Sequence, residues 1–195
     1  MRLSIYVKAL AGILILGAAL LLPGARAHSP GAPPAVLPGQ TVTLLPDGRW
    51  LLIGGQGAHG PLATVTIQDP GTGSTTALPP LRQSRAGHSA TVLPEGGVLV
   101  LGGLGADGQL VTALEHYDPV SQSSHAMTSA GLTPRAYHSA TLLTDGRVLV
   151  AGGVSPAGQV LGDAQLFDPL TQAVEPVPAP LTTPRRGATA SLLSD

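Results

Sequence analysis

The sequence predicts an all-β fold built from repeated four-stranded antiparallel sheets, the organisation of a partial β-propeller. The main observation is a stretch that occurs twice: residues 85–103 read RAGHSATVLPEGGVLVLGG, and residues 135–153 read RAYHSATLLTDGRVLVAGG. A shorter copy precedes them at residues 41–55 (TVTLLPDGRWLLIGG), and another begins at residue 185 (RRGATASLLSD). Arg85, Arg135 and Arg185 follow one another at intervals of 50 residues. A fixed period of roughly 20–50 residues is typical of repeat architectures.

Each copy begins with a predicted hairpin. In the first copy, residues 41–45 form a short strand, and Pro46-Asp47-Gly48 forms the turn, because proline presets φ and glycine accepts a positive φ. The second strand is an unbroken apolar run at residues 50–53, 98–101 and 148–151, which predicts burial on both faces. A glycine pair follows each run and lets a neighbouring sheet approach closely; these glycines are Gly54, Gly55, Gly102, Gly103, Gly152 and Gly153.

The third strand of each copy alternates, and the alternation predicts a half-buried strand. Thr66, Glu115 and Gln165 are its central polar residues, and each strand ends in an Asp-Pro pair at Asp69, Asp118 or Asp168. A weaker fourth strand follows near residues 75–78, 123–127 and 173–177. The predicted organisation is a Pro-rich tether (28–39), three blades (40–84, 85–134 and 135–184) and the first strand of a truncated fourth blade (185–195).

The N-terminus has the pattern of a secretory signal peptide over residues 1–27. Arg2 and Lys8 form a positive n-region before an apolar run over residues 9–22, and residues 25–27 (ARA) form a small-x-small site that predicts cleavage between Ala27 and His28. An uncleaved N-terminal anchor is the alternative. We therefore expect a secreted, periplasmic or cell-envelope protein without a membrane span after cleavage. The chain has no cysteine, which excludes disulfides and thiolate metal sites.

The charge balance argues against nucleic acid as a partner. Beyond residue 27, seven arginines face eleven Asp and Glu residues, a net charge of −4 with histidine neutral. No run of basic residues forms the stripe that a phosphate backbone requires.

The repeated motifs resemble those of kelch repeats. The resemblance rests on the R-x-x-H-S-A opening, the apolar strand ending in Gly-Gly, and the YDP and FDP endings at residues 117–119 and 167–169, and it covers residues 40–195. The tryptophan usual in the fourth kelch strand is replaced by Thr75, Ser124 and Val174. The pattern is similar to that of secreted bacterial proteins of the galactose-oxidase-like kind, and it implies a kelch-type β-propeller.

The number of copies is smaller than a closed propeller requires, since such rings have roughly four to eight blades. We expect the chain to be the N-terminal portion of a longer protein or of a truncated reading frame. Its partners would then include the remaining blades of a longer chain or further copies of itself.

The repeated polar residues are interpreted as framework rather than as a catalytic site. They occupy the same position in successive copies, whereas a site requires each residue only once; they are Arg85, His88, Arg135, His138 and Arg185. Ser89 and Ser139 directly follow His88 and His138, and neighbours on a strand point to opposite faces, so adjacent residues cannot form a nucleophilic pair. We expect no catalytic residue in this chain.

The loops between the second and third strands differ among the copies, and variable loops on a rigid frame are where recognition usually occurs. Their polar residues His59, Asp107, Gln109 and Gln159 are the candidate binding residues. No histidine spacing indicates a metal site, and we expect no cofactor. The copper site with a Tyr–Cys cross-link that the galactose-oxidase resemblance implies cannot be assembled without cysteine.

The leading prediction is therefore an exported module that binds a protein or a glycan, or serves as a scaffold, without catalysis. The alternative is the N-terminal part of a galactose-oxidase-like enzyme whose catalytic residues lie beyond residue 195. A non-functional truncated product is the third possibility.

Overall fold

The computed structural model describes residues 34–128, 130–179 and 181–192. These residues form strands, turns and loops, and within them no helix is long and apolar enough to cross a membrane. The predicted signal peptide, its cleavage site at Ala27 and His28, and residues 28–33 of the predicted tether lie outside the described residues.

Three four-stranded antiparallel sheets account for most of the strands. The first sheet contains β1 (Thr41–Leu44), β2 (Trp50–Ile53), β5 (Val65–Gln68) and β6 (Thr75–Leu78). The second contains β7 (Ser89–Val92), β8 (Val98–Leu101), β9 (Leu114–Asp118) and β10 (Ser123–Met127). The third contains β11 (Ser139–Leu142), β12 (Val148–Ala151), β13 (Ala164–Phe167) and β14 (Val174–Pro176), and a small hairpin joins β3 (Gln56–Gly57) to β4 (Gly60–Pro61). The predicted all-β fold of four-stranded antiparallel sheets is confirmed.

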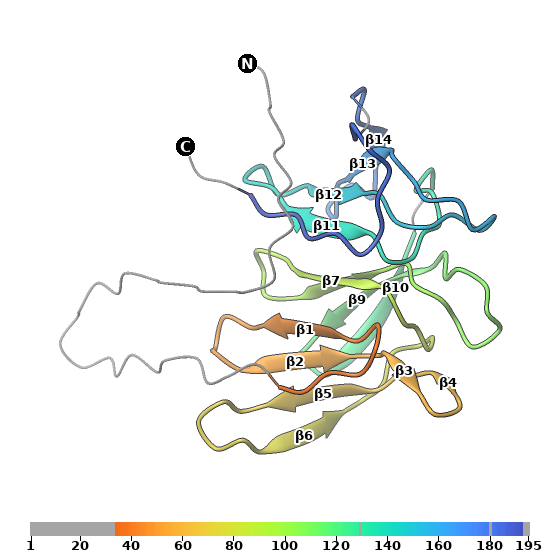
Figure 1. Ribbon diagram of the computed structural model, residues 1–195. Helices are drawn as coiled ribbons and strands as arrows, with labels where there is room; N and C mark the ends of the chain where they lie inside the picture. The colour runs from red at the N-terminus through yellow and green to blue at the C-terminus, as the bar shows by residue number, and fades with distance from the viewer. Residues whose placement is uncertain (1–33, 129, 180, 193–195) are drawn as a thin grey trace.

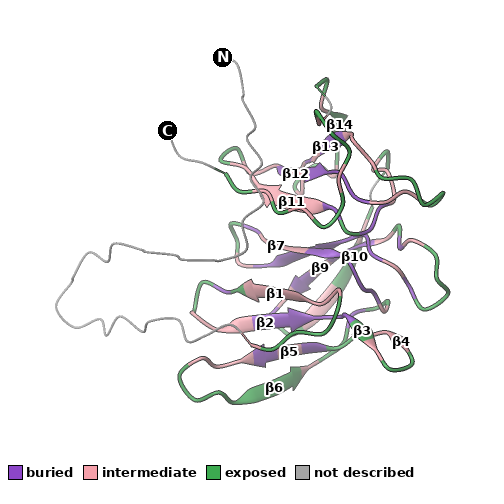
Figure 2. Ribbon diagram, viewed as in Figure 1, coloured by how far each residue is buried: buried purple, intermediate pink, exposed green. Residues whose placement is uncertain are grey.

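The sheets lie side by side, and the first strand of the second sheet, β7, contacts both β1 and β11 (Figure 1). Apolar side chains fill the two spaces between the sheets, where Figure 2 shows the central strands as buried. Val98 and Val100 of β8 belong to the cluster with the first sheet, and Leu99 and Leu101 belong to the cluster with the third. The unbroken apolar run is thus explained, since each face of β8 meets a different sheet.

The turns follow the chemistry expected from the sequence. Gly48 has φ +87° and donates its N–H to the carbonyl of Leu45 at 2.9 Å, which closes the first hairpin. In the turn after β5, Oδ1 of Asp69 accepts the N–H groups of Gly71 and Thr72 at 2.7 and 3.1 Å. Asp118 and Asp168 cap the corresponding turns in the other sheets in the same way.

Two details differ from the sequence-based expectation. The third strand was expected to be half-buried, but its polar residues Glu115 and Gln165 are 1% and 9% exposed. Their side chains are covered because a buried arginine and the connector before it pack over that face of the sheet.

The expected first strand of a fourth blade is also not formed in the described residues up to 192. Residues 185–192 still follow the edge of the third sheet, since Gly153 donates to the carbonyl of Arg185 at 2.8 Å and Thr141 donates to that of Ala190 at 3.2 Å. In the described part of the chain no further strand pairs with this segment, so it remains an extended loop.

Candidate functional site

A buried arginine holds the connector that enters the second sheet. Arg85 is fully buried and pairs with Glu115 at 2.5 Å, while its Nη1 donates to the carbonyls of Gly102 and Ala113, each at 3.2 Å. The Glu115 carboxylate also accepts the backbone N–H groups of Arg82 and Gln83, at 2.8 and 3.3 Å. Burial lowers the pKa of Arg85, and the Glu115 carboxylate opposes that shift. The ion pair therefore fixes the backbone of residues 82–83.

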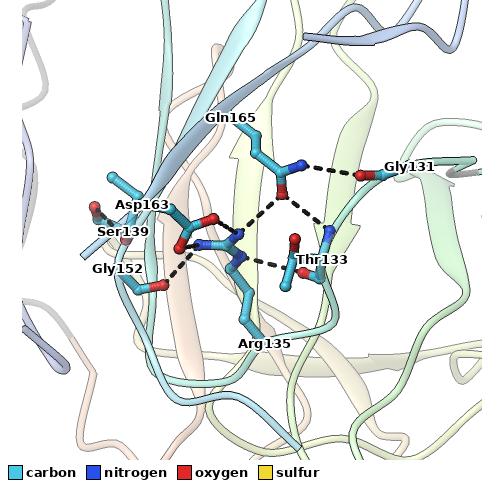
Figure 3. Close-up of polar contacts among 8 residues, drawn as sticks. Gly131, Thr133, Arg135, Ser139, Gly152, Asp163 and Gln165 are labelled. Atoms are coloured by element: carbon cyan, nitrogen blue, oxygen red, sulfur yellow. Dashed lines mark hydrogen bonds and ion pairs between the residues drawn. The ribbon is translucent and has the colours of Figure 1, made fainter. Parts of the chain in front are cut away.

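Arg135 occupies the same position in the third sheet but has different partners (Figure 3). It donates to the carbonyl of Gly152 at 2.9 Å, to Oδ2 of Asp163 at 2.8 Å and to Oε1 of Gln165 at 2.9 Å. Gln165 in turn accepts the N–H of Thr133 at 2.9 Å. Figure 3 shows these side chains converging on the guanidinium, so this arginine also positions the connector before it.

Each junction between sheets contains a buried histidine that bonds to a hydroxyl of the preceding sheet. Nε2 of His88 lies 3.1 Å from Oγ1 of Thr41, and Nε2 of His138 lies 2.9 Å from Oγ of Ser89. Within the described residues, Nδ1 of each ring is buried without a hydrogen-bond partner. Burial, together with the positive charge of Arg85 or Arg135 nearby, lowers the pKa of each histidine to about 3. Both rings are therefore neutral at pH 7.

The contact between Ser89 and His138 is a serine–histidine pair that arises between successive sheets rather than between adjacent residues. Ser89 is 8% exposed, and among the residues that the structure describes, no carboxylate bonds to Nδ1 of His138 to orient the ring for catalysis. Since an activated serine needs both access and an oriented base, we interpret this pair as a structural link.

A chain of backbone hydrogen bonds connects the segments that precede the first strands of the three sheets, and it continues to Gly187. Gly87 donates to the carbonyl of Gly39 at 2.8 Å, Tyr137 donates to that of Gly87 at 2.7 Å, and Gly187 donates to that of Tyr137 at 2.7 Å. All four residues have a positive φ, between 56° and 68°. Tyr137 is the only one of the four that carries a side chain.

A hollow lies where a connector meets a variable loop. It has a volume of about 500 Å³ and is lined by residues 82–84 and 105–112. The side chains of Arg82, Gln83, Asp107 and Gln109 supply its charged and amide groups. Two hydrogen bonds close the turn at residues 105–109: Gly105 donates to the carbonyl of Gln109 at 2.8 Å, and Asp107 accepts the N–H of Gln109 at 3.0 Å.

A smaller hollow of about 170 Å³ adjoins the first and shares Gln109 and Leu110 with it. Its remaining lining comes from the segments that follow β8 and β12 and from the segment before β11, and it includes Tyr137, Val154, Ser155 and Pro156. The variable loops that follow β8 and β12 are thus gathered at one end of the second and third sheets.

The structure places the sequence-predicted binding residues in three locations. Asp107 and Gln109 lie together in the first hollow. His59 is exposed in the turn between β3 and β4, and Gln159 is exposed near Ser155, whose Oγ accepts the Gln159 N–H at 3.2 Å. Neither His59 nor Gln159 lines the two hollows. In the described part of the chain, no three His, Asp or Glu side chains are gathered in an arrangement that could hold a metal ion.

The sequence analysis assigned no role at this site to Arg82, Glu115 or Tyr137. For Glu115 a signal exists, because Arg85 and Glu115 are separated by 30 residues, as are Arg135 and Gln165. For Tyr137 the signal is the tyrosine in RAYH, where the other copies have glycine (RAGH and RRGA).

Comparison with known proteins shows the fold. No family model matches the chain, and no curated protein matches it. The solved structure of YjhT, a kelch-type β-propeller protein, is similar with a TM-score of 0.65 and 18% sequence identity. The match covers 78% of this chain and 54% of the YjhT chain, so the chain spans about half the length of that structure. The fold is that of a β-propeller. The three sheets described above are thus propeller blades.

Proposed function

We propose that this chain is a kelch-type propeller module, exported from the cell, that binds a protein or glycan ligand at the end of the blades where the two hollows lie. The observation that carries the proposal is the hollow of about 500 Å³ between residues 82–84 and 105–112. Concave sites with a few convergent polar groups are where proteins usually bind ligands.

The frame around this hollow supports the proposal. The connector is fixed by the buried Arg85–Glu115 pair, and the loop is fixed by its own hydrogen bonds. Leu104, at the base of the loop, also exchanges two backbone hydrogen bonds with Ala86, at 2.8 and 3.0 Å. A site that is formed before the ligand arrives loses little conformational entropy on binding.

The direct test uses the chain immobilised at its C-terminus and probed with a glycan array and with a displayed peptide library. We expect the wild-type chain to select a ligand and the double variant Arg82→Ala/Gln109→Ala to bind it at least about tenfold more weakly, since about 1.4 kcal/mol of lost contact energy has this effect. The matched control is Leu170→Ser, because Leu170 is 93% exposed in the turn between β13 and β14, at the opposite end of the sheet.

Selection of no ligand from either library, or a ligand that binds the double variant as well as the wild type, contradicts the proposal. His59→Ala and Gln159→Ala examine the other two residues predicted from the sequence, and we expect them to matter less because neither lines a hollow.

Export is supported by the composition of residues 1–27. Expression of the full chain in a secretion-competent bacterium, followed by intact-mass measurement of the exported protein, should give a product that begins at His28. Recovery of the unprocessed chain alone would contradict this part of the proposal.

A further inference from the structure

Tyr137 departs from the repeat at a position where the backbone favours glycine. Its φ is +56°, and the equivalent residues Gly39, Gly87 and Gly187 have φ values of +66°, +68° and +63°. A bulky residue in the left-handed region is strained, and such strain persists mainly at functional sites. Glycine adopts this backbone conformation without strain at the other three positions, so the backbone does not explain the tyrosine at position 137.

The ring of Tyr137 is held in place and partly open to solvent. The residue is 40% exposed. A Cβ atom added to Gly87 would lie 2.6 Å from Cε1 of Tyr137, so the ring packs directly on the Gly87 backbone, and only glycine leaves room for it. The tyrosine thus presents a pre-positioned aromatic surface to the smaller hollow.

The smaller hollow has the size and lining for one ring of a ligand. Its volume of about 170 Å³ is bounded by Tyr137, Leu104, Val154 and Pro156, and Ser155 adds a hydroxyl. Gln109 contributes to both hollows, so a ligand that fills the smaller hollow continues into the larger one. There it meets Arg82 and Asp107, whose opposite formal charges cancel, so the hollow has no excess charge that would select an anion or a cation.

We infer that Tyr137 is the stacking platform for one pyranose ring of a neutral saccharide whose hydroxyl groups reach Gln109 and the larger hollow. This inference rests on the proposed function and narrows its ligand class. A pyranose presents a C–H face that packs on an aromatic ring and an edge of hydroxyl groups that bond to amide, guanidinium and carboxylate groups. The aromatic wall and the polar hollow beside it match these two surfaces.

The test is saturation-transfer NMR with the methyl pyranosides of glucose, galactose, mannose and N-acetylglucosamine as probes. We expect the wild-type chain and Tyr137→Phe to transfer saturation to the C–H protons on one face of at least one of these rings. Tyr137→Gly should reduce that transfer at least about tenfold. Leu170→Ser, at the opposite end of the blade, should transfer saturation as the wild type does.

The glycine variant separates recognition from folding. Because glycine is the residue at the three equivalent positions, Tyr137→Gly should melt at the wild-type temperature or above it. A purely structural tyrosine would instead show a lower melting temperature together with unchanged saturation transfer.

Three results would overturn the inference: no transfer from the wild type to any probe, transfer that survives in Tyr137→Gly, or selection of peptides only by the immobilised chain. In the last case the proposed binding function stands while the saccharide assignment fails. If the chain selects no ligand from the glycan array or the peptide library and transfers saturation to none of the methyl pyranosides, both the proposed binding function and the saccharide assignment fail.

Discussion

The junction between the first and second blades and the junction between the second and third contain the same buried arginine, but the two arginines are neutralised differently. Arg85 and Glu115 form a pair with side chains 0% and 1% exposed. Arg135 instead pairs with Asp163, whose side chain is 45% exposed, and shares the amide oxygen of Gln165. The first pair is withdrawn from water, whereas the second reaches it.

The fourth strands differ to match. Ser124 donates to the Glu115 carboxylate at 2.6 Å, and the equivalent residue in the third blade is Val174, which has no hydroxyl. Gln165 uses its amide nitrogen to donate to the carbonyl of Gly131 at 2.9 Å. The Glu115 carboxylate therefore accepts hydrogen bonds only from donors around it. The Gln165 amide instead accepts two hydrogen bonds at its oxygen and donates one from its nitrogen. The residue that faces the arginine and the residue on the fourth strand therefore differ together between the two blades, Glu115 with Ser124 in one and Gln165 with Val174 in the other, while the arginine stays the same.

The largest change in the free energy of unfolding is expected from Glu115→Gln. The change leaves the buried Arg85 charge without an anionic partner and turns an amide NH₂ toward the N–H of Arg82 and the hydroxyl of Ser124. Breaking a buried ion pair in this way should lower the free energy of unfolding by about 4 kcal/mol. Urea unfolding followed by the fluorescence of Trp50 measures it, and a loss below about 1 kcal/mol would show that the first junction does not depend on the buried charge pair.

The two junctions should respond alike to acid, because each contains a buried neutral histidine. The folded-state pKa values of His88 and His138 are about 3, below the value of about 6.5 expected in the unfolded chain. A depressed pKa means that this stability is complete above about pH 6.5 and is lost as the pH falls toward 3. At pH 5 each histidine should lower the free energy of unfolding by about 2 kcal/mol relative to pH 7.

Urea titrations between pH 7 and pH 4.5 measure this loss. His138→Gln should halve the dependence on pH, since one of the two rings is removed. The pKa values of Asp47, Asp118, Asp145 and Asp168 are lowered from 3.8, mainly by hydrogen bonds from neighbouring side chains, so the stability that these carboxylates contribute is lost mostly below pH 4.5. A stability that is constant from pH 7 to pH 4.5 would rule out buried neutral histidines at both junctions.

Asp163→Asn tests the solvent-exposed member of the comparison. Arg135 retains Gln165, Gly152 and Thr133 as acceptors, so the free energy of unfolding should fall by only about 1 kcal/mol. This loss should shrink in 1 M NaCl, where the Debye length is about 3 Å, whereas the loss from Glu115→Gln should not. Equal salt dependence of the two variants would contradict the distinction between a dry and a solvated pair.

The smallest change in the free energy of unfolding is expected from Ser84→Pro. Pro134 and Pro184 precede Arg135 and Arg185, and the Nε atoms of these arginines donate to Thr133 and Thr183, each at 3.1 Å. Nε of Arg85 is buried without a partner within the described residues. Proline at position 84 should raise the free energy of unfolding by about 0.5–1 kcal/mol. Thermal unfolding measures the change, with Ser84→Ala as the control, and a destabilised proline variant would mean that the first connector follows a different path.

Much of the fold could be predicted because its signals are local. The apolar runs, glycine pairs and Asp-Pro turns each act within a few residues, and they predicted the four-stranded sheets. The candidate site was accessible only in part. Asp107 and Gln109 were identifiable as polar residues in a variable loop, but Arg82 lies in a connector whose proximity to that loop depends on the buried Glu115. Tyr137 was hidden because its motif was interpreted as framework, and framework positions were expected to be equivalent.

The sequence by itself determined the repeating blade, since strand periodicity and turn chemistry depend on residues close together in the chain. The tertiary structure decided which polar side chains are buried and which loops meet. Alternation places Glu115 and Gln165 on one face of a strand, but only the arginine and connector packed over that face remove them from water. The hollow at Tyr137 likewise exists only because two consecutive blades pack together and bring Gln109 and Pro156, which are 47 residues apart in the chain, to the same place.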